Sequence, residues 1–212
     1  MKTDDLISTL ASDSQWRARP VGVWFVAALI AALPVSMWMF MMSLGFRKDA
    51  MTAMHNPFFD LKFVVTIALA SAAIAISLHL SRPEVSLGRW GWMLAIPLGL
   101  LGIGIAGDLA VHGRADWSER LIGKNSMVCM TAIPFLSVPF LIASLVTLRR
   151  GAPSRPAVAG AFAGLLSAGL AATLYASHCT DDSPLFVATW YTIAAVVTAA
   201  VGAAIGARVL KY

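Results

Sequence analysis

The chain has 212 residues, of which 58% are hydrophobic and only 13% are charged, and its mean hydropathy is +0.76. Soluble domains carry roughly 25% charged residues, so this composition excludes an ordinary soluble globular protein. The net charge of +5 does not require nucleic acid as a partner. Basic residues at the ends of apolar segments serve membrane topology and contact with anionic lipids, and we expect no direct binding of nucleic acid.

The polar opening of the chain predicts a short amphipathic helix. In MKTDDLISTLASD a threonine can cap the helix, two aspartates favour its first turn, and three aliphatic residues share one face. The side chains of residues 1–13 sum to −2, which suits a basic protein partner better than an anionic membrane surface. A disordered tail is the alternative. The candidate docking residues are Lys2, Thr3, Asp4, Asp5, Leu6, Ile7 and Leu10.

Six hydrophobic segments follow, each with about the 20 residues that a membrane-spanning helix needs. The predicted fold is therefore all-α, a polytopic membrane protein with six transmembrane helices in residues 21–212, preceded by a polar segment at 1–20. This segment lacks the pattern of a signal peptide, so we expect it to be retained. The predicted spans lie near 21–44, 61–80, 91–111, 127–148, 157–177 and 185–207.

The distribution of basic residues predicts the orientation. Ten of the 16 Lys and Arg residues lie in segments on the same side as the two termini, and six lie on the opposite side. Cytoplasmic loops carry the excess of Lys and Arg, so both termini are predicted to be cytoplasmic (N-in/C-in). The last outer loop, residues 178–184, has no positive charge.

The two cysteines, Cys129 and Cys179, are predicted to reach the same outer depth. Each lies 25 residues from Ser154, near the centre of the turn at 149–156 between the fourth and fifth spans. Helices rise by about 1.5 Å per residue, so two helices of equal length on either side of the turn place both thiols at the same depth in the membrane. Three interpretations stay open: a structural disulfide, two unrelated buried thiols, or a pair that responds to redox state or metal, which we favour.

Further sulfur and imidazole side chains gather in the predicted outer half. Thioether, thiolate and imidazole suit copper, cadmium or zinc, although methionine is also a common apolar filler of helix packing. No spacing matches a closed zinc site. The candidate auxiliary residues for metal or redox chemistry are Met37, Met41, Met42, His55, Met127, Met130 and His178.

Glycine spacings in the spans favour helix packing over nucleotide binding. Gly102, Gly104 and Gly107 satisfy G-x-G-x-x-G, but they lie inside a hydrophobic span, whereas a nucleotide fingerprint follows a strand. Two further pairs place small residues four apart, which lets helix backbones approach closely. These pairs are Gly160 with Gly164 and Gly202 with Gly206.

Charged residues are scarce within the spans. We expect Asp108 to reach the membrane interface from the end of the third span, and Asp60 and Lys62 to mark the interface at the start of the second. No catalytic set of Ser, His and Asp, no paired buried carboxylates and no phosphate loop are recognisable, so an enzyme is not expected. The alternative function is a small transporter or efflux component for a soft metal ion, although transporters carry polar groups at mid-membrane.

The N-terminal sequence Lys-Thr-Asp-Asp-Leu-Ile, the six-span layout and the outer cysteines together resemble the NrsF family, the negative regulators of sigma F in proteobacteria. The resemblance implies a multi-pass anti-sigma factor of the bacterial inner membrane, whose N-terminal segment holds an extracytoplasmic-function (ECF) sigma factor. It also implies that Cys129 and Cys179 respond to heavy-metal or oxidative stress, with no required cofactor. We therefore expect two coupled sites, one for the sigma factor and one for the signal.

Overall fold

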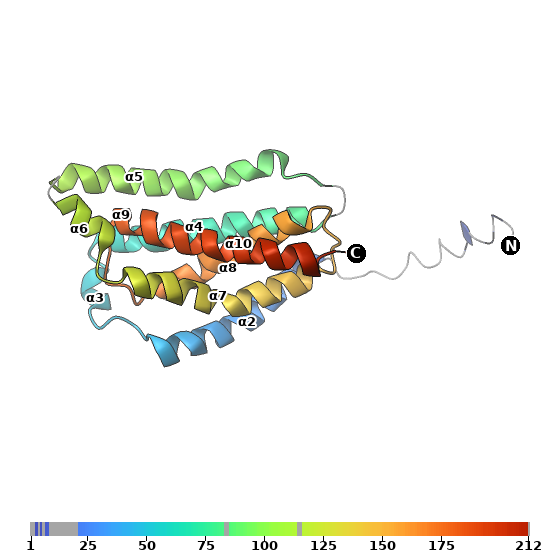
Figure 1. Ribbon diagram of the computed structural model, residues 1–212, viewed down its shortest axis with the longest axis horizontal. Helices are drawn as coiled ribbons and strands as arrows, with labels where there is room; N and C mark the ends of the chain where they lie inside the picture. Colours follow the sequence, from blue (N-terminus) through green and yellow to red (C-terminus); the bar gives the residue numbers. More distant parts are fainter. Residues whose placement is uncertain are drawn as a thin grey trace.

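The computed structural model describes residues 3, 5, 7, 8, 21–82, 85–113 and 116–211. All regular structure within these residues is helical, which confirms the all-α prediction (Figure 1). Six segments are long and apolar enough to cross a membrane, as predicted. They are α2 (Val21–Ser43); α4 (Pro57–Leu80); a 3₁₀ turn (Gly88–Leu94) with α5 (Ala95–Val111); α6 (Trp117–Ile122) with α7 (Ser126–Leu148); α8 (Pro156–Ala176); and α9 (Pro184–Phe186), a π-helical turn (Val187–Tyr191) and α10 (Thr192–Val209).

Local sequence signals explain where several helices begin. The side chain of Asn56 accepts a hydrogen bond from the backbone of Phe58 at 3.0 Å and so caps α4, and proline follows at the first helical position. Proline also opens α8. The second span starts at Pro57 rather than at 61, because this cap lies before the purely apolar run from which the prediction was made.

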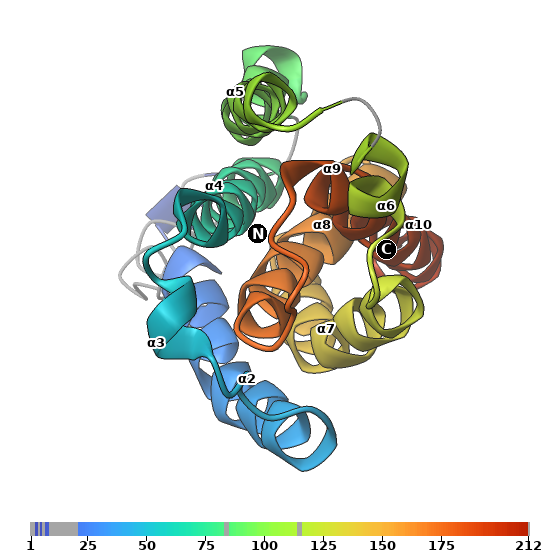
Figure 2. The ribbon, with the colours of Figure 1, turned by 90° about the vertical axis from the view of Figure 1, so that its left-hand side faces the viewer.

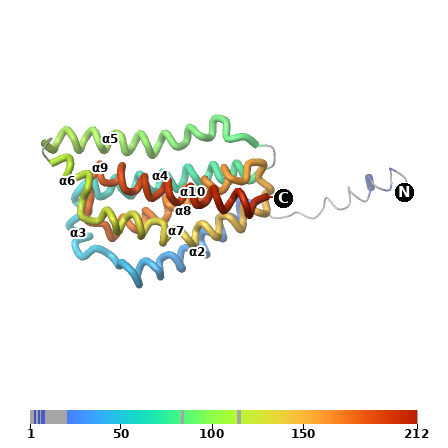
Figure 3. The backbone as a smooth tube through the Cα atoms, viewed as in Figure 1, coloured from blue at the N-terminus to red at the C-terminus, as the bar shows by residue number. Residues whose placement is uncertain are grey.

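The helices form one bundle with α8 near its centre and α5 at its edge (Figure 2). The chain begins α2 and ends α10 at the same end of the bundle (Figure 3). We call this the terminal end. The opposite end, which carries the short helix α3 (Ala50–Ala53), α6 and residues 177–183, is called the cysteine end.

The glycine pairs of α8 and α10 lie where the backbones of these two helices approach closely, as predicted. A Cβ atom built at Gly160 would collide with the backbone of Gly202, and one at Gly164 would collide with the backbone of Thr198. The glycines of α5 behave differently: only Gly104 lies tightly against another helix, at Leu61, whereas Gly102 has no neighbour within 4 Å. The prediction that this run is a packing face therefore holds for one turn of α5 only.

Candidate functional site

The segment at 177–183, which we call the signal loop, joins α8 to α9 at the cysteine end and carries Cys179. Its last residue, Ser183, caps α9 by accepting a hydrogen bond from the backbone of Leu185 at 3.2 Å. Pro184 then occupies the first helical position, which fixes where the loop ends. The loop is tied by polar contacts to four other parts of the chain, described below.

The carboxylate of Asp182 is shared by two buried cations. Lys62 Nζ donates to Asp182 Oδ1 at 2.6 Å and to the carbonyl oxygen of Cys179 at 2.7 Å. Arg47 Nη1 donates to the same two groups, at 2.9 Å and 3.1 Å. The side chain of Lys62 is 0% exposed and that of Arg47 is 5% exposed. Lys62, predicted to mark the membrane interface, is thus buried in the bundle, where the ion pair with Asp182 neutralises its charge.

The backbone that follows α2 is bonded directly to the signal loop. The amide of Arg47 donates to the carbonyl of Ser177 at 3.1 Å, and His178 Nδ1 lies 2.9 Å from the carbonyl oxygen of Gly45. Arg47 also forms an ion pair with Asp49 at 2.7 Å, and hydrogen bonding to Arg47 lowers the pKa of Asp49 to about 2. Segment 45–47 and the signal loop thus form one bonded unit.

Asp108 is a second anchor for the signal loop. It is fully buried, forms an ion pair with Arg120 of α6, and accepts a hydrogen bond from Ser183 Oγ at 3.1 Å. His112 Nδ1 lies 3.2 Å from its carboxylate. Asp108, predicted to reach the membrane interface, is thus buried at the cysteine end, because α6 turns back toward the bundle and brings Arg120 to it.

A third anchor joins the signal loop to the start of α7. The carboxylate of Asp181 accepts hydrogen bonds from the backbone amides of Lys124 at 3.1 Å and Asn125 at 2.8 Å, and from Asn125 Nδ2 at 2.9 Å. Free amides at a helix N-terminus favour a negative charge. Asp181 therefore stabilises the helix that carries Cys129.

Cys129 and Cys179 are both free thiols, 0% exposed, and belong to one buried cluster with Phe40, Tyr175 and Phe186. The structural disulfide considered from the sequence is thus not formed. Cys179 Sγ lies 3.7 Å from the carbonyl oxygen of Asp181. Burial raises the pKa of the Cys179 thiol, and the nearby charge of Lys62 opposes this effect only in part. The thiol therefore stays protonated in the resting structure.

Only part of the predicted auxiliary set lies near these thiols. Met37 and Met130 are half-buried and pack against the cysteine cluster, and His178 is half-buried within the signal loop. Within the described ranges, no group of three His, Cys, Asp or Glu side chains is arranged to hold a metal ion. The remaining members, which point away from the core and are exposed, are Met41, Met42, His55 and Met127.

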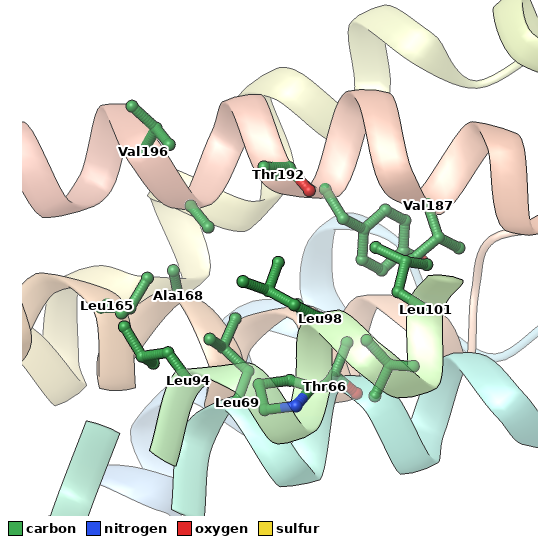
Figure 4. Close-up of a pocket in the computed structure, with 15 residues that line it drawn as sticks. Thr66, Leu69, Leu94, Leu98, Leu101, Leu165, Ala168, Val187, Thr192 and Val196 are labelled. Atoms are coloured by element: carbon green, nitrogen blue, oxygen red, sulfur yellow. The ribbon is translucent and has the colours of Figure 1, made fainter. Parts of the chain in front are cut away.

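Two of the cavities in this part of the bundle differ in character. A polar one of about 630 Å³ opens beside the signal loop, between acidic and basic side chains that include Asp181, Asp182 and Arg120. The other, of about 180 Å³, is apolar and lies between α4, α5, α8 and α10 (Figure 4). Its labelled side chains are aliphatic except for Thr66 and Thr192, and Tyr191 also lines it, so it can accommodate a small, largely apolar group.

Sequence reasoning did not identify the ionic anchors of the signal loop. Two signals were available: a lysine within an apolar helix, which is costly in a membrane, and the adjacent Asp181 and Asp182 in a loop without basic residues. Together they indicate a charge that must be neutralised from elsewhere in the chain. Arg47 and Lys62 provide that neutralisation.

The N-terminal docking prediction is only partly within the described residues. Thr3, Asp5, Ile7 and Ser8 are helical and exposed, and Ser8 Oγ donates to the carbonyl oxygen of Asp5 at 3.0 Å. The other predicted docking residues, Lys2, Asp4, Leu6 and Leu10, lie outside the described residues.

Comparison with known proteins agrees with the resemblance drawn from the sequence. Residues 10–212 match the family described as NrsF, negative regulator of sigma F. The anti-sigma-F factor NrsF of Caulobacter vibrioides (strain NA1000 / CB15N) is 33% identical over 223 aligned positions, and the probable anti-sigma-F factor NrsF of Azospira oryzae (strain ATCC BAA-33 / DSM 13638 / PS) is 31% identical over 216. Both alignments cover the whole of each chain. No solved structure matches.

Proposed function

The chain belongs to the NrsF family of negative regulators of sigma F, and from this premise we propose that it is a membrane-bound anti-sigma factor with a periplasmic sensor. In this proposal residues 1–20 hold an ECF sigma factor at the inner membrane. Residues 21–212 form the sensor domain, which releases the sigma factor when heavy-metal or oxidative stress reaches Cys129 and Cys179. Family membership favours this regulatory role over catalysis.

The orientation proposed here places the terminal end in the cytoplasm. At that end basic side chains such as Arg149, Arg155 and Arg208 are exposed. At the cysteine end Arg47, Lys62 and Arg120 are instead neutralised by acidic partners. The excess of unneutralised positive charge at the terminal end supports an N-in/C-in topology.

The N-terminal segment is the proposed sigma-factor site. Ile7 is 59% exposed although it is a large aliphatic residue, and it lies in helical backbone two positions after the acidic Asp5. An exposed apolar side chain beside negative charge fits a partner that offers an apolar groove with a basic rim. This combination supports docking onto a sigma factor rather than onto an anionic membrane.

The observation that carries the proposal is the bonded contact between segment 45–47 and the signal loop. Arg47 follows α2, and α2 leads back to the N-terminal segment. Ser36 in α2 also donates to the buried carbonyl of Leu136 in α7, at 2.8 Å. A change at Cys179 would therefore reach α2 through Arg47, and a change at Cys129 would reach it through α7.

Release of the sigma factor requires that the signal favour one state of the sensor. Shifting two states from 1:99 to 99:1 takes about 5.5 kcal/mol of differential stabilisation. Thiolate ligation of copper, cadmium or zinc, or oxidation of the thiols, could supply this energy, with Met37, Met130 and His178 as candidate auxiliary groups. Because both thiols are fully buried, the signal must first gain access to them.

Co-purification with the cognate sigma factor tests this proposal. We expect the detergent-solubilised intact chain to capture the sigma factor and a chain lacking residues 2–13 to lose it. The point variant Ile7→Asp should weaken capture, whereas its neighbour Ser8→Ala should not, since both positions are exposed but only Ile7 offers apolar surface. Failure of the folded intact chain to capture the sigma factor would refute the docking role.

A transcription assay tests the sensor half of the proposal separately. The double variant Cys129→Ser, Cys179→Ser should still silence a sigma-dependent promoter but should no longer respond to cadmium or an oxidant. Normal induction in that variant would show that the signal is read elsewhere.

A further inference from the structure

We infer that Lys62 is the positioning residue that keeps the signal loop closed over Cys179, and that its release from Asp182 opens this thiol but not Cys129. The inference deepens the proposed function, because the loop is then the entry point of the proposed signal. It rests on contacts within the chain and can be tested without a sigma factor.

The ammonium group of Lys62 is hydrogen-bonded to the signal loop at two points. It donates to the carbonyl oxygen of Cys179 at 2.7 Å and to the carboxylate of Asp182 at 2.6 Å. The two acceptors lie three residues apart in the loop, so the single ammonium group fixes both the backbone at the cysteine and the acidic end of the loop. The side chain of Lys62 is 0% exposed, so water does not replace either acceptor while the loop is closed.

Lys62 differs from Arg47 in what remains when the loop moves away. Arg47 keeps a second carboxylate, because it is also paired with the exposed Asp49 at 2.7 Å. In the described part of the chain, Lys62 has no ion pair other than that with Asp182. An open loop would leave its ammonium group against the ring of Phe59, 4.9 Å from the centroid, with no carboxylate in ion-pair contact.

This asymmetry makes Lys62 the stronger determinant of closure. An unpaired charge in buried surroundings is costly, so the free energy of opening the loop includes the loss of this partner. Arg47 loses less, because Asp49 continues to neutralise it. Of these two cations, Lys62 therefore contributes more to closure of the loop, whereas Arg47 keeps its bond to Asp49 when the loop moves.

Opening of the signal loop is expected to affect the two thiols differently. Cys179 belongs to the loop itself, and its own carbonyl oxygen is one of the two acceptors of Lys62. Cys129 lies outside the loop, near the start of α7, and is buried in a cluster that contains side chains of α2, α7 and α8 as well as Cys179. Opening of the loop should expose the first thiol and leave the second protected.

Alkylation of single-cysteine variants tests the inference. Purified full-length protein in detergent, carrying either Cys129→Ala or Cys179→Ala, is treated with a charged maleimide, and the labelling rate of the remaining thiol is measured by mass. We expect Lys62→Met to raise the rate at Cys179 at least about tenfold, because labelling follows the population of the locally open loop. The rate at Cys129 should stay within about twofold of the parent chain.

Lys48→Met is the matched control, because Lys48 is exposed at the same end of the bundle and the same charge is removed. It should change neither rate. Asp182→Asn provides a second variant, and it should also raise labelling at Cys179 selectively. An unchanged rate at Cys179 in Lys62→Met would overturn the inference. An equal rise at both thiols would also overturn it, since Lys62 would then support the whole bundle rather than the loop.

The outcome is separable from that of the proposed function. Selective labelling with no capture of the sigma factor would leave the loop inference standing and refute the docking role. Capture of the sigma factor without selective labelling of Cys179 would support the docking role and refute the loop inference. If both hold, Lys62→Met should also lower the cadmium concentration needed to induce sigma-dependent transcription in cells, whereas Lys48→Met should not.

Discussion

Gly160 and Gly202 face each other across the contact between α8 and α10, and a Cβ atom added to either glycine would collide with the carbonyl oxygen of the other. The relation is reciprocal, so both helices need the absence of a side chain at this level. In a membrane, where the lipid is as apolar as the helices, such close backbone packing is a main source of helix association.

The first prediction follows from this contact. Gly160→Ala should lower the free energy of unfolding by about 1–3 kcal/mol, because the backbones must move apart to accept the methyl group. Gly102→Ala is the matched control: it lies in another apolar helix, and its Cβ would meet nothing within 4 Å. Thermal unfolding in detergent, followed by circular dichroism, measures both, and equal midpoints for the two variants would contradict the packing argument.

The second prediction concerns the buried carboxylate of Asp108. Asp108→Asn should destabilise the protein by about 1–3 kcal/mol, because it removes the negative partner of Arg120 from a buried site. Asp116→Asn changes an exposed acid on the same side of the bundle and should alter stability by less than about 0.5 kcal/mol. Thermal unfolding of the two variants and the parent in the same detergent distinguishes these outcomes, and a neutral Asp108→Asn would show that the ion pair contributes little.

The third prediction is a pH dependence caused by Cys179. Burial raises its pKa in the folded protein, so above the ordinary value of about 8.5 the unfolded chain loses this proton while the folded chain keeps it. The unfolded state then binds fewer protons, and the free energy of unfolding falls as pH rises beyond that value. Cys179→Ala should flatten the slope between pH 8.5 and 10, as measured by urea or thermal unfolding, and an identical slope in the variant would exclude this thiol as the cause.

The fourth prediction separates the methionines. Met37 packs against the cysteine cluster, whereas Met42 is 72% exposed. If thioether sulfur assists a soft metal at the thiols, Met37→Leu should reduce the transcriptional response to cadmium severalfold while Met42→Leu leaves it unchanged. Leucine preserves apolar volume, so the comparison isolates the sulfur atom. Equal responses in both variants would assign the methionines to packing alone.

Much of the fold was predictable because a membrane span is specified locally. About 20 consecutive apolar residues indicate a span whatever the rest of the chain does, and the small residues at Gly160 and Gly202 indicate a close helix contact. Helix starts were predicted less well where polar caps such as Asn56 precede the apolar run.

The ionic anchors were not predictable in the same way, since they join residues far apart in the chain. Lys62 and Asp182 are 120 positions apart, and no periodicity relates them. From the sequence alone, a lysine near the end of a span is assigned to the membrane interface, because the loop that covers it cannot be identified. The burial of Asp108 was not predictable for the same reason, because its partner Arg120 reaches it only after α6 turns back toward the bundle.

The tight pairing of α8 and α10 also decides where a reporter can be attached. Because α10 packs tightly against the central helix α8 and ends at the terminal end, a fluorescent protein fused after the last residue should report the position of the helix bundle without disturbing the signal loop or α2. A fusion before Met1 would instead attach a bulky domain to the segment that is proposed to bind the sigma factor. Imaging and pull-down experiments on this protein are therefore best built from its C-terminus.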